Sequence, residues 1–162
     1  MSNTTDTRKA TVTLPADDQI LITREFDAPR HLVYKAWTTP ELVKRWFGGN
    51  HGEVISAEID LRVGGTWRYV TAEGDGPEFG FHGEYRELVP NERIVSTEVY
   101  EGAPDAESVN TLTLTEHDGR TTMTVLVQHQ SAANRDAVIE AGMESGMNAA
   151  LDALERVARA LA

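Results

Sequence analysis

Two ionisable side chains, Glu98 and His129, lie in stretches whose residues alternate in character as they do along a β-strand. Glu98 shares its face with Ser96 and Tyr100, and His129 continues an apolar face. That apolar face consists of Met123, Val125 and Val127. A carboxyl or imidazole group on an apolar wall would have a shifted pKa, and it could bind a polar ligand group or transfer a proton. These two residues are therefore the candidate catalytic or ligand-recognising groups.

A simpler interpretation stays open for each of them. The opposite face of the Glu98 strand is at least as apolar, so Glu98 could instead point outward into solvent. That opposite face carries Val95, Thr97 and Val99. His129 could be a strand-end histidine near the rim of the domain.

Aromatic side chains recur at a spacing of two residues, which places them on the same side of a strand. Trp67 and Tyr69 share one strand face, and a second strand face carries Phe79, Phe81 and Tyr85. These rings either line a concave sheet surface or form an ordinary aromatic core, and the two arrangements differ in volume.

The stretch "EAGMESGMNAALDALERVARALA" has helical spacing, and we expect one helix from about residue 134 to residue 160, roughly 40 Å long. The inner stripe of its first half consists of Gly142, Met143, Gly146 and Met147. The opposite, polar side consists of Glu144, Asp152, Glu155 and Arg159. A glycine inside a helix costs about 1 kcal/mol relative to alanine. The glycines therefore indicate either close approach of helix and sheet or space for a ligand beside adaptable methionines.

The composition narrows the class of protein. The chain has 162 residues and a formal net charge of −11, which argues against nucleic acid and an anionic membrane surface as partners. It has no cysteine, so disulfides, thiolate metal sites and a cysteine nucleophile are excluded. Nucleotide-binding and metalloprotease motifs are missing and the five histidines are scattered, so we expect no metal and no cofactor. Without a signal-peptide pattern or a long apolar run, we expect a cytoplasmic protein.

The order of elements predicts the architecture. We expect residues 1–18 to be a mobile or partly ordered segment and residues 19–162 to form a single domain. A strand ending at Phe26 precedes two short helices, and a run of six strands follows. Those strands are predicted near residues 53–61, 65–73, 79–88, 92–101, 108–117 and 120–129. Because an antiparallel sheet with one apolar face curls around an amphipathic helix, the pattern predicts an α+β domain with six to seven strands.

Five stretches carry a family resemblance. They read "REFDAPRHLVYKAWTTPELVKRWFGG", "DLRVGGTWRYV", "GEYRELVPNERIVSTEVYEG", "TLTLTEHDGRTTMTVLV" and "GMESGMNAALDALERV". Together they resemble the bacterial activator-of-heat-shock-protein-90-ATPase-like branch of the START-like, or SRPBCC, superfamily, over about residues 20–160. The resemblance implies a helix-grip fold, in which a curved antiparallel sheet wraps the C-terminal helix and leaves a cavity between them.

The resemblance also orients individual residues. Related chains often carry aromatic residues at the positions of Ser96, Glu98 and Tyr100, which implies that this face looks into the cavity. They often carry tryptophan at the position of Met147. Both departures in this chain imply a cavity that is larger or more polar than is usual in the family.

We therefore expect a protein that binds a small, largely hydrophobic or aromatic molecule between the sheet and the C-terminal helix. Trp46 and Phe47, before the flexible Gly48–Gly49 pair, are candidates for a gate. The predicted ligand-binding residues are Trp46, Phe47, Trp67, Tyr69, Phe79, Phe81, Tyr85, Glu98, Tyr100, Met123, Val125, Val127, His129, Met143, Gly146 and Met147. Two alternatives stay open: an enzyme of the polyketide cyclase or dehydratase kind using Glu98 or His129, and an interaction module that contacts a chaperone in a stress response. We expect a monomer or a homodimer.

Overall fold

The protein is built around one curved sheet and one long helix. The computed structural model describes residues 10–49 and 52–162, and within these residues eight antiparallel strands form one sheet in the order β1-β2-β8-β7-β6-β5-β4-β3. The strands are β1 (Thr11–Thr13), β2 (Gln19–Phe26), β3 (Glu53–Ile59), β4 (Thr66–Ala72), β5 (Glu78–Val89), β6 (Arg93–Tyr100), β7 (Ser108–His117) and β8 (Arg120–Gln128). The helices are α1 (Arg30–Thr38), α2 (Pro40–Val43), α3 (Ala132–Glu140) and α4 (Met143–Ala160).

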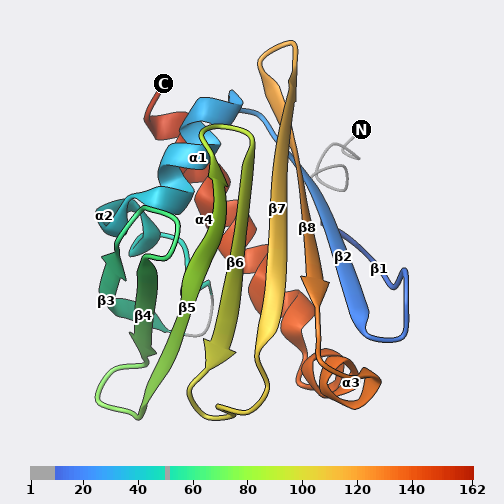
Figure 1. Ribbon diagram of the computed structural model, residues 1–162. Helices are drawn as coiled ribbons and strands as arrows, with labels where there is room; N and C mark the ends of the chain where they lie inside the picture. The colour runs from blue at the N-terminus through green and yellow to red at the C-terminus, as the bar shows by residue number, and fades with distance from the viewer. Residues whose placement is uncertain (1–9, 50–51) are drawn as a thin grey trace, which may run out of the picture.

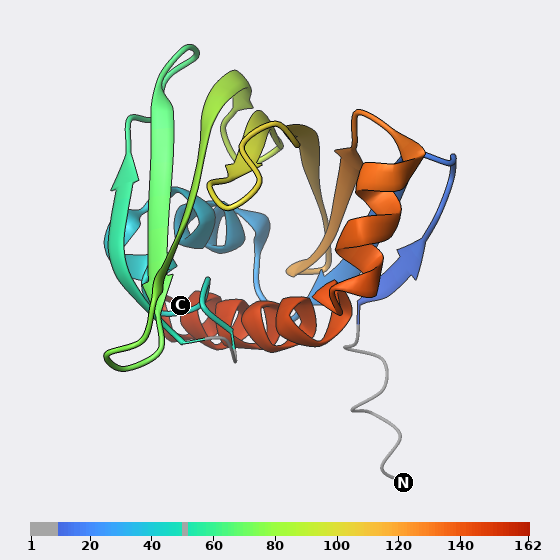
Figure 2. The same ribbon diagram turned by 90° about the horizontal axis from the view of Figure 1, so that it is seen from below.

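The sheet curves around α4 (Figure 1). Figure 2 shows α4 lying along the open side of the curve, with α1 and α2 toward the β3 edge and α3 toward the β2 edge. The predicted helix-grip fold is thereby confirmed.

The six strands predicted between residues 53 and 129 are present, and each end lies within two residues of its predicted position. Turn residues explain this agreement, because Asn91, Asp118 and Gly119 adopt the positive φ angles that tight connections require. The sheet has one strand more than the largest number expected, because β1 pairs with β2. β1 lies in the segment predicted as mobile or partly ordered, of which residues 1–9 fall outside the described residues.

The prediction of one continuous helix over residues 134–160 is wrong. α3 ends at Glu140, and α4 begins at Met143 after Gly142, whose φ of 80° places it in the left-handed region. Glycine has no Cβ and enters that region at little cost, so Gly142 ends one helix and starts another. At 1.5 Å per residue, α4 alone is about 27 Å long.

The C-terminal half of α4 is fixed to the sheet. Leu151, Leu154 and Val157 are buried in one core cluster with residues of α1 and of the sheet. Glu155, which the helical pattern places on the polar side, is instead buried and pairs with Arg24 of β2, with 2.6 Å between Nη2 and Oε1. The placement of Glu155 in solvent is therefore wrong, because its partner lies on a strand 131 residues away.

Candidate ligand-binding cavity

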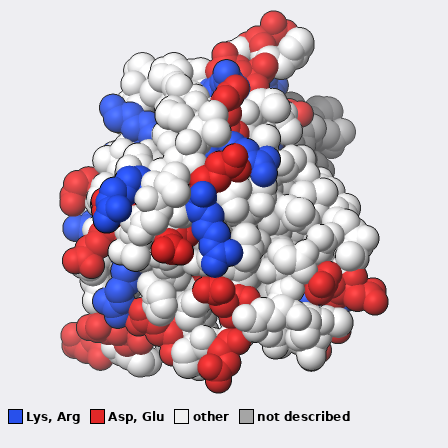
Figure 3. Space-filling model, in the orientation of Figure 1, with Lys and Arg blue, Asp and Glu red and all other residues white. Residues whose placement is uncertain are grey.

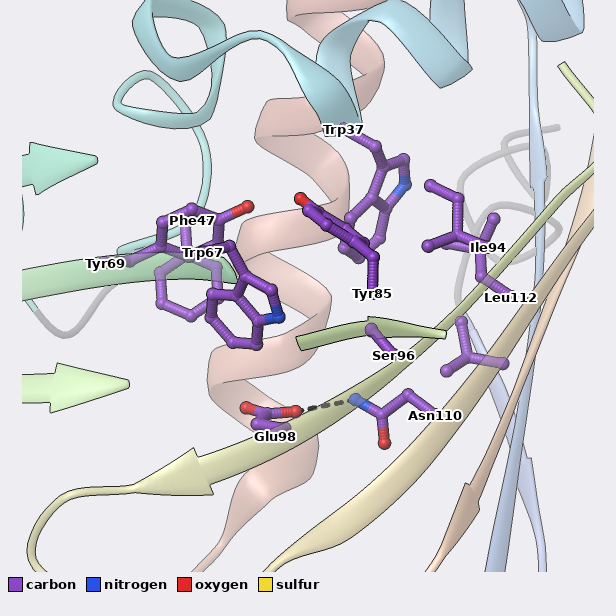
Figure 4. A pocket seen from close by; sticks show the side chains of 11 residues that line it. Trp37, Phe47, Trp67, Tyr69, Tyr85, Ile94, Ser96, Glu98, Asn110 and Leu112 are labelled. Atoms are coloured by element: carbon purple, nitrogen blue, oxygen red, sulfur yellow. Dashed lines mark hydrogen bonds between the residues drawn. The ribbon is translucent and has the colours of Figure 1, made fainter. Parts of the chain in front are cut away.

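Two adjoining chambers lie between the sheet and the helices. The large chamber has a volume of about 450 Å³ and is bounded by the sheet, α3, the first half of α4 and the segment after α2. The small chamber has a volume of about 120 Å³ and lies between Trp37 of α1 and strands β4 to β8 (Figure 4). Both chambers share five lining residues, which are Trp37, Phe47, Glu98, Asn110 and Val125. The two chambers are therefore parts of one cavity.

Most of the residues predicted to bind a ligand lie on the walls of these chambers. The small chamber is lined by Phe47, Trp67, Tyr69, Tyr85, Glu98 and Val125. The large chamber is lined by Trp46, Phe47, Phe81, Glu98, Tyr100, Met123, Val125, Val127, His129, Met143, Gly146 and Met147.

Phe79 is the exception, because it lines neither chamber. It is 38% exposed near the start of β5, where its ring lies 6.4 Å from that of Tyr100. Alternation places Phe79 on the same strand face as Phe81, but alternation does not report where along the strand the cavity ends.

The two aromatic strands turn the same face toward the cavity. Tyr69 pairs with Phe81 and Trp67 pairs with Gly83 across β4 and β5, so these residues lie side by side on one surface. Gly83 makes room for the indole, since a Cβ there would lie 2.6 Å from Trp67 Nε1. The same Cβ would collide with the backbone oxygen of Thr97, so this position accepts only glycine.

The phenol groups of Tyr69 and Tyr85 both line the small chamber. Burial raises the pKa of both groups above the ordinary tyrosine value. Both phenols therefore stay protonated at neutral pH.

Glu98 is the acidic group shared by the two chambers. Asn110 Nδ2 donates a hydrogen bond of 2.7 Å to Glu98 Oε1, from the neighbouring strand β7 (Figure 4). Burial raises the pKa of the Glu98 carboxyl above its ordinary value, and the hydrogen bond from Asn110 opposes this rise. Within the described residues, no lysine or arginine lines either chamber, so no fixed positive side chain there neutralises this carboxylate.

His129 lines the large chamber near α3 and is 8% exposed. Burial lowers the pKa of its imidazole, Arg135 lowers it further and Asp18 opposes the shift. The ring is therefore neutral at pH 7. Its Nε2 atom has no hydrogen-bond partner among the described residues, and no hydrogen bond there joins it to Glu98.

Trp46 and Phe47, the proposed gate, differ in how firmly they are held. Trp46 is buried, and its Nε1 donates a 3.0 Å hydrogen bond to the carbonyl oxygen of Ala36. Phe47 is half-buried, and its ring lies 4.8 Å from Tyr69 and 5.4 Å from Phe81. Of the two, Phe47 lines both chambers, whereas Trp46 lines the large chamber alone.

The small residues in the helix have two explanations, which are space for a ligand and close approach of another element. Gly146 fits both. It lines the large chamber, and it also lies under the segment that follows α2. A Cβ on Gly49 would lie 2.7 Å from the carbonyl oxygen of Gly146. The close approach at this point is between helix and loop rather than between helix and sheet.

Trp37 and Asn110 are lining residues that the sequence analysis did not identify. Trp37 follows the buried Val33 by one helical turn, and its ring lies 4.6 Å from that of Trp46. Asn110 shares a strand face with Leu112 and Leu114. A polar residue that continues an apolar strand face is a sequence pattern from which Asn110 could have been predicted as a lining residue.

Among residues 10–49 and 52–162, no cluster of three or more histidine, aspartate or glutamate side chains could hold a metal ion. In the same part of the chain, no helix is both long and apolar enough to cross a membrane.

A curved antiparallel sheet grips a helix across a cavity, which is the helix-grip fold. The chain belongs to the family described as activator of Hsp90 ATPase homolog 1-like protein, whose sequence model matches residues 27–159. None of the curated proteins matches the sequence.

Solved structures of several bacterial proteins have the same fold. A protein of Rhodobacter sphaeroides is 23% identical with a TM-score of 0.87, and the alignment covers 94% of this chain and 99% of the other. A protein of Nitrosomonas europaea is 24% identical with a TM-score of 0.82, covering 91% and 98%. A protein of Mycobacterium smegmatis is 24% identical with a TM-score of 0.79, covering 94% and 99%. At these identities the likeness concerns the fold alone.

Proposed function

We propose that this protein binds a small, largely apolar molecule in the cavity between the sheet and α4. The observation that carries the proposal is a large chamber of about 450 Å³, within the range of small-molecule pockets, walled mainly by apolar side chains. It adjoins an aromatic small chamber that contains one carboxyl group. A ligand would fit these two chambers if its apolar body lay in the large chamber and its polar group lay in the small chamber.

The methionines of α4 support the same proposal. Met143 and Met147 are partly buried, and they line the large chamber at the end of α4 where none of the residues is fully buried. Unbranched, polarisable side chains adapt to the shape of a ligand at low cost. The C-terminal half of α4 then holds the helix in place while the first half contacts the ligand.

An enzyme of the cyclase or dehydratase kind is the second candidate, and the environment of Glu98 favours it. A carboxyl group with a raised pKa inside a cavity can act as a general acid or base, which contributes about 10² to 10⁴ in rate. Contact with a chaperone, the oligomeric state and a cytoplasmic location stay predictions.

Filling the large chamber tests the proposal. We expect Met147→Trp to weaken the binding of the neutral apolar dye Nile red by roughly tenfold or more, because the indole occupies the volume that the dye needs. Arg156→Trp places the same side chain on the exposed side of α4 and should leave the affinity unchanged. Dye fluorescence measures binding, and circular dichroism checks that both variants fold. Equal affinities for Met147→Trp and the unmodified protein would contradict the cavity as the binding site.

A further inference from the structure

We propose that the ligand carries a positively charged ammonium group, which the small chamber binds between its aromatic rings and the Glu98 carboxylate. This inference rests on the proposed function and specifies the chemical class of its ligand: an amphiphilic amine or quaternary ammonium compound.

The balance of charge in the cavity favours a cationic ligand. Glu98 is the one charged side chain on the walls of the small chamber as described, and its hydrogen-bond partner, the amide of Asn110, is neutral. Glu98 is half-buried, and a carboxylate that is partly shielded from water without a cation favours either uptake of a proton or a positive charge beside it. An anionic ligand would be repelled by Glu98 and would find no lysine or arginine on the described walls. A cationic ligand supplies the missing charge.

The aromatic rings of the small chamber also favour a cationic ligand. Trp37, Phe47, Trp67, Tyr69 and Tyr85 surround the small chamber. Figure 4 shows Phe47, Trp67 and Tyr69 on the left, Trp37 and Tyr85 to their right, and Glu98 below. The faces of aromatic rings are negative and attract a cation within about 6 Å, most strongly where water is excluded. Several rings combined with one carboxylate form the environment that binds an ammonium group.

The hydroxyl groups of this chamber are consistent with a cation. Burial raises the pKa of both the Tyr69 and the Tyr85 phenol, so neither hydroxyl carries a negative charge that would compete with Glu98 for the cation. A ligand cation without N–H groups needs no hydrogen bonds from the chamber, only negative charge and ring faces.

The two volumes match the two ends of such a ligand. The small chamber of about 120 Å³ admits a compact head group, and the adjoining 450 Å³ holds an apolar tail. The tail would lie against Met123, Val127 and Met147 of the large chamber. The raised pKa of Glu98 fits this arrangement, because binding a cation would favour the ionised carboxylate and release a proton.

Competition with bound Nile red tests the inference. We compare benzyltrimethylammonium with neopentylbenzene, in which a neutral carbon replaces the nitrogen without a change of shape. The unmodified protein should bind the cation roughly tenfold more tightly than the neutral compound. Glu98→Gln should remove most of that preference, and it should change the affinity for neopentylbenzene by less than about twofold. Glu84→Gln, which removes an exposed carboxylate that lines neither chamber, should keep the preference.

Two results would overturn the inference. One is that the unmodified protein binds neopentylbenzene as tightly as the cation or more tightly, a comparison that needs no variant to fold. The other is that folded Glu98→Gln retains the preference for the cation. In both cases Nile red still binds and the proposed function stands, whereas failure of Nile red to bind counts against the proposed function itself.

Discussion

Arg24 determines how α4 is attached to the sheet. Only 1% exposed, it contacts Asp152 at 2.9 Å and Glu155 at 2.6 Å, and its guanidinium lies 4.9 Å from the ring centre of Phe26. Glu155 also accepts the backbone N–H of Asp27 at 2.9 Å. Both members of the buried pair therefore have several partners, which is the condition under which a buried ion pair is tolerated.

Removing the buried charge should be costly. We expect Glu155→Gln to lower the free energy of unfolding by about 3 kcal/mol, because the buried guanidinium of Arg24 loses its buried counter-ion. Asp152→Asn removes a partner whose side chain is 55% exposed and should cost less than about 1 kcal/mol. Urea unfolding curves of the two variants measure the difference. Equal losses of unfolding free energy in the two variants would contradict a larger contribution of the buried pair to stability.

The sequence indicates which side chains line the cavity where an alternating pattern extends along a strand into it. The rings of Trp67, Tyr69 and Tyr85 belong to strands whose periodicity fixes their face, and all three line the small chamber. Trp37 was missed because it belongs to a short helix whose orientation depends on its packing against α4. Glu155 was misplaced because a helical pattern carries no information about a partner on another element.

At the level of elements, the break between α3 and α4 matters most for the cavity. α3 has no fully buried residue, yet its Asn134 and Val138 line the large chamber. Ser131 caps α3 by accepting a 3.1 Å hydrogen bond from the backbone N–H of Asn134. The left-handed Gly142 lets α3 turn away from the axis of α4 and form one wall of the chamber.

Substitution of Gly142 distinguishes two helices from one. We expect Gly142→Ala to destabilise the protein by about 1 kcal/mol or more, because an L-residue with a Cβ is strained in the left-handed region. In a continuous helix the same change would stabilise by about 1 kcal/mol, so the sign of the effect decides. Gly142→Asn should cost less than the alanine variant, because asparagine tolerates this conformation. Thermal and urea unfolding measure all three proteins.

The sequence predicts the strands of the meander better than it predicts how the sheet is completed. β3 to β8 pair with sequence neighbours across short turns, and glycine, asparagine and proline mark those turns. β2, by contrast, pairs with β8, with Gln19 opposite Gln128. No local pattern encodes a pairing over about one hundred residues, so that pairing follows only from the family resemblance.

The molecule as a whole carries a large negative net charge. The formal net charge is −11, and Figure 3 shows basic and acidic side chains intermixed on the visible face of the sheet. On this outer face, Arg68 and His82 both contact Glu101, and these hydrogen bonds lower the pKa of the Glu101 carboxyl to about 2. Such local pairs neutralise one another, but acidic residues are in excess over the whole chain. The resulting negative potential attracts cations at long range.

Salt should therefore affect the binding of a cationic ligand through its association rate. We expect the association rate of benzyltrimethylammonium to fall by roughly threefold between low and physiological ionic strength, because salt screens the attraction. The rate for neopentylbenzene should stay constant under the same conditions. Stopped-flow measurement of tryptophan fluorescence suits the experiment, because Trp37, Trp46 and Trp67 all line the cavity. Equal salt dependence for both compounds would contradict long-range attraction.

The contact between Arg24 and Glu155 joins residues 131 positions apart, and it has a consequence for the order of folding. The meander of β3 to β8 can form from neighbouring hairpins, whereas α4 docks only after a long chain segment has closed, which is entropically expensive. Until α4 docks, the large chamber lacks the wall formed by Met143 and Met147. A bound molecule thus has no site on a partly folded chain, and it prolongs the lifetime of the finished fold instead of guiding its formation.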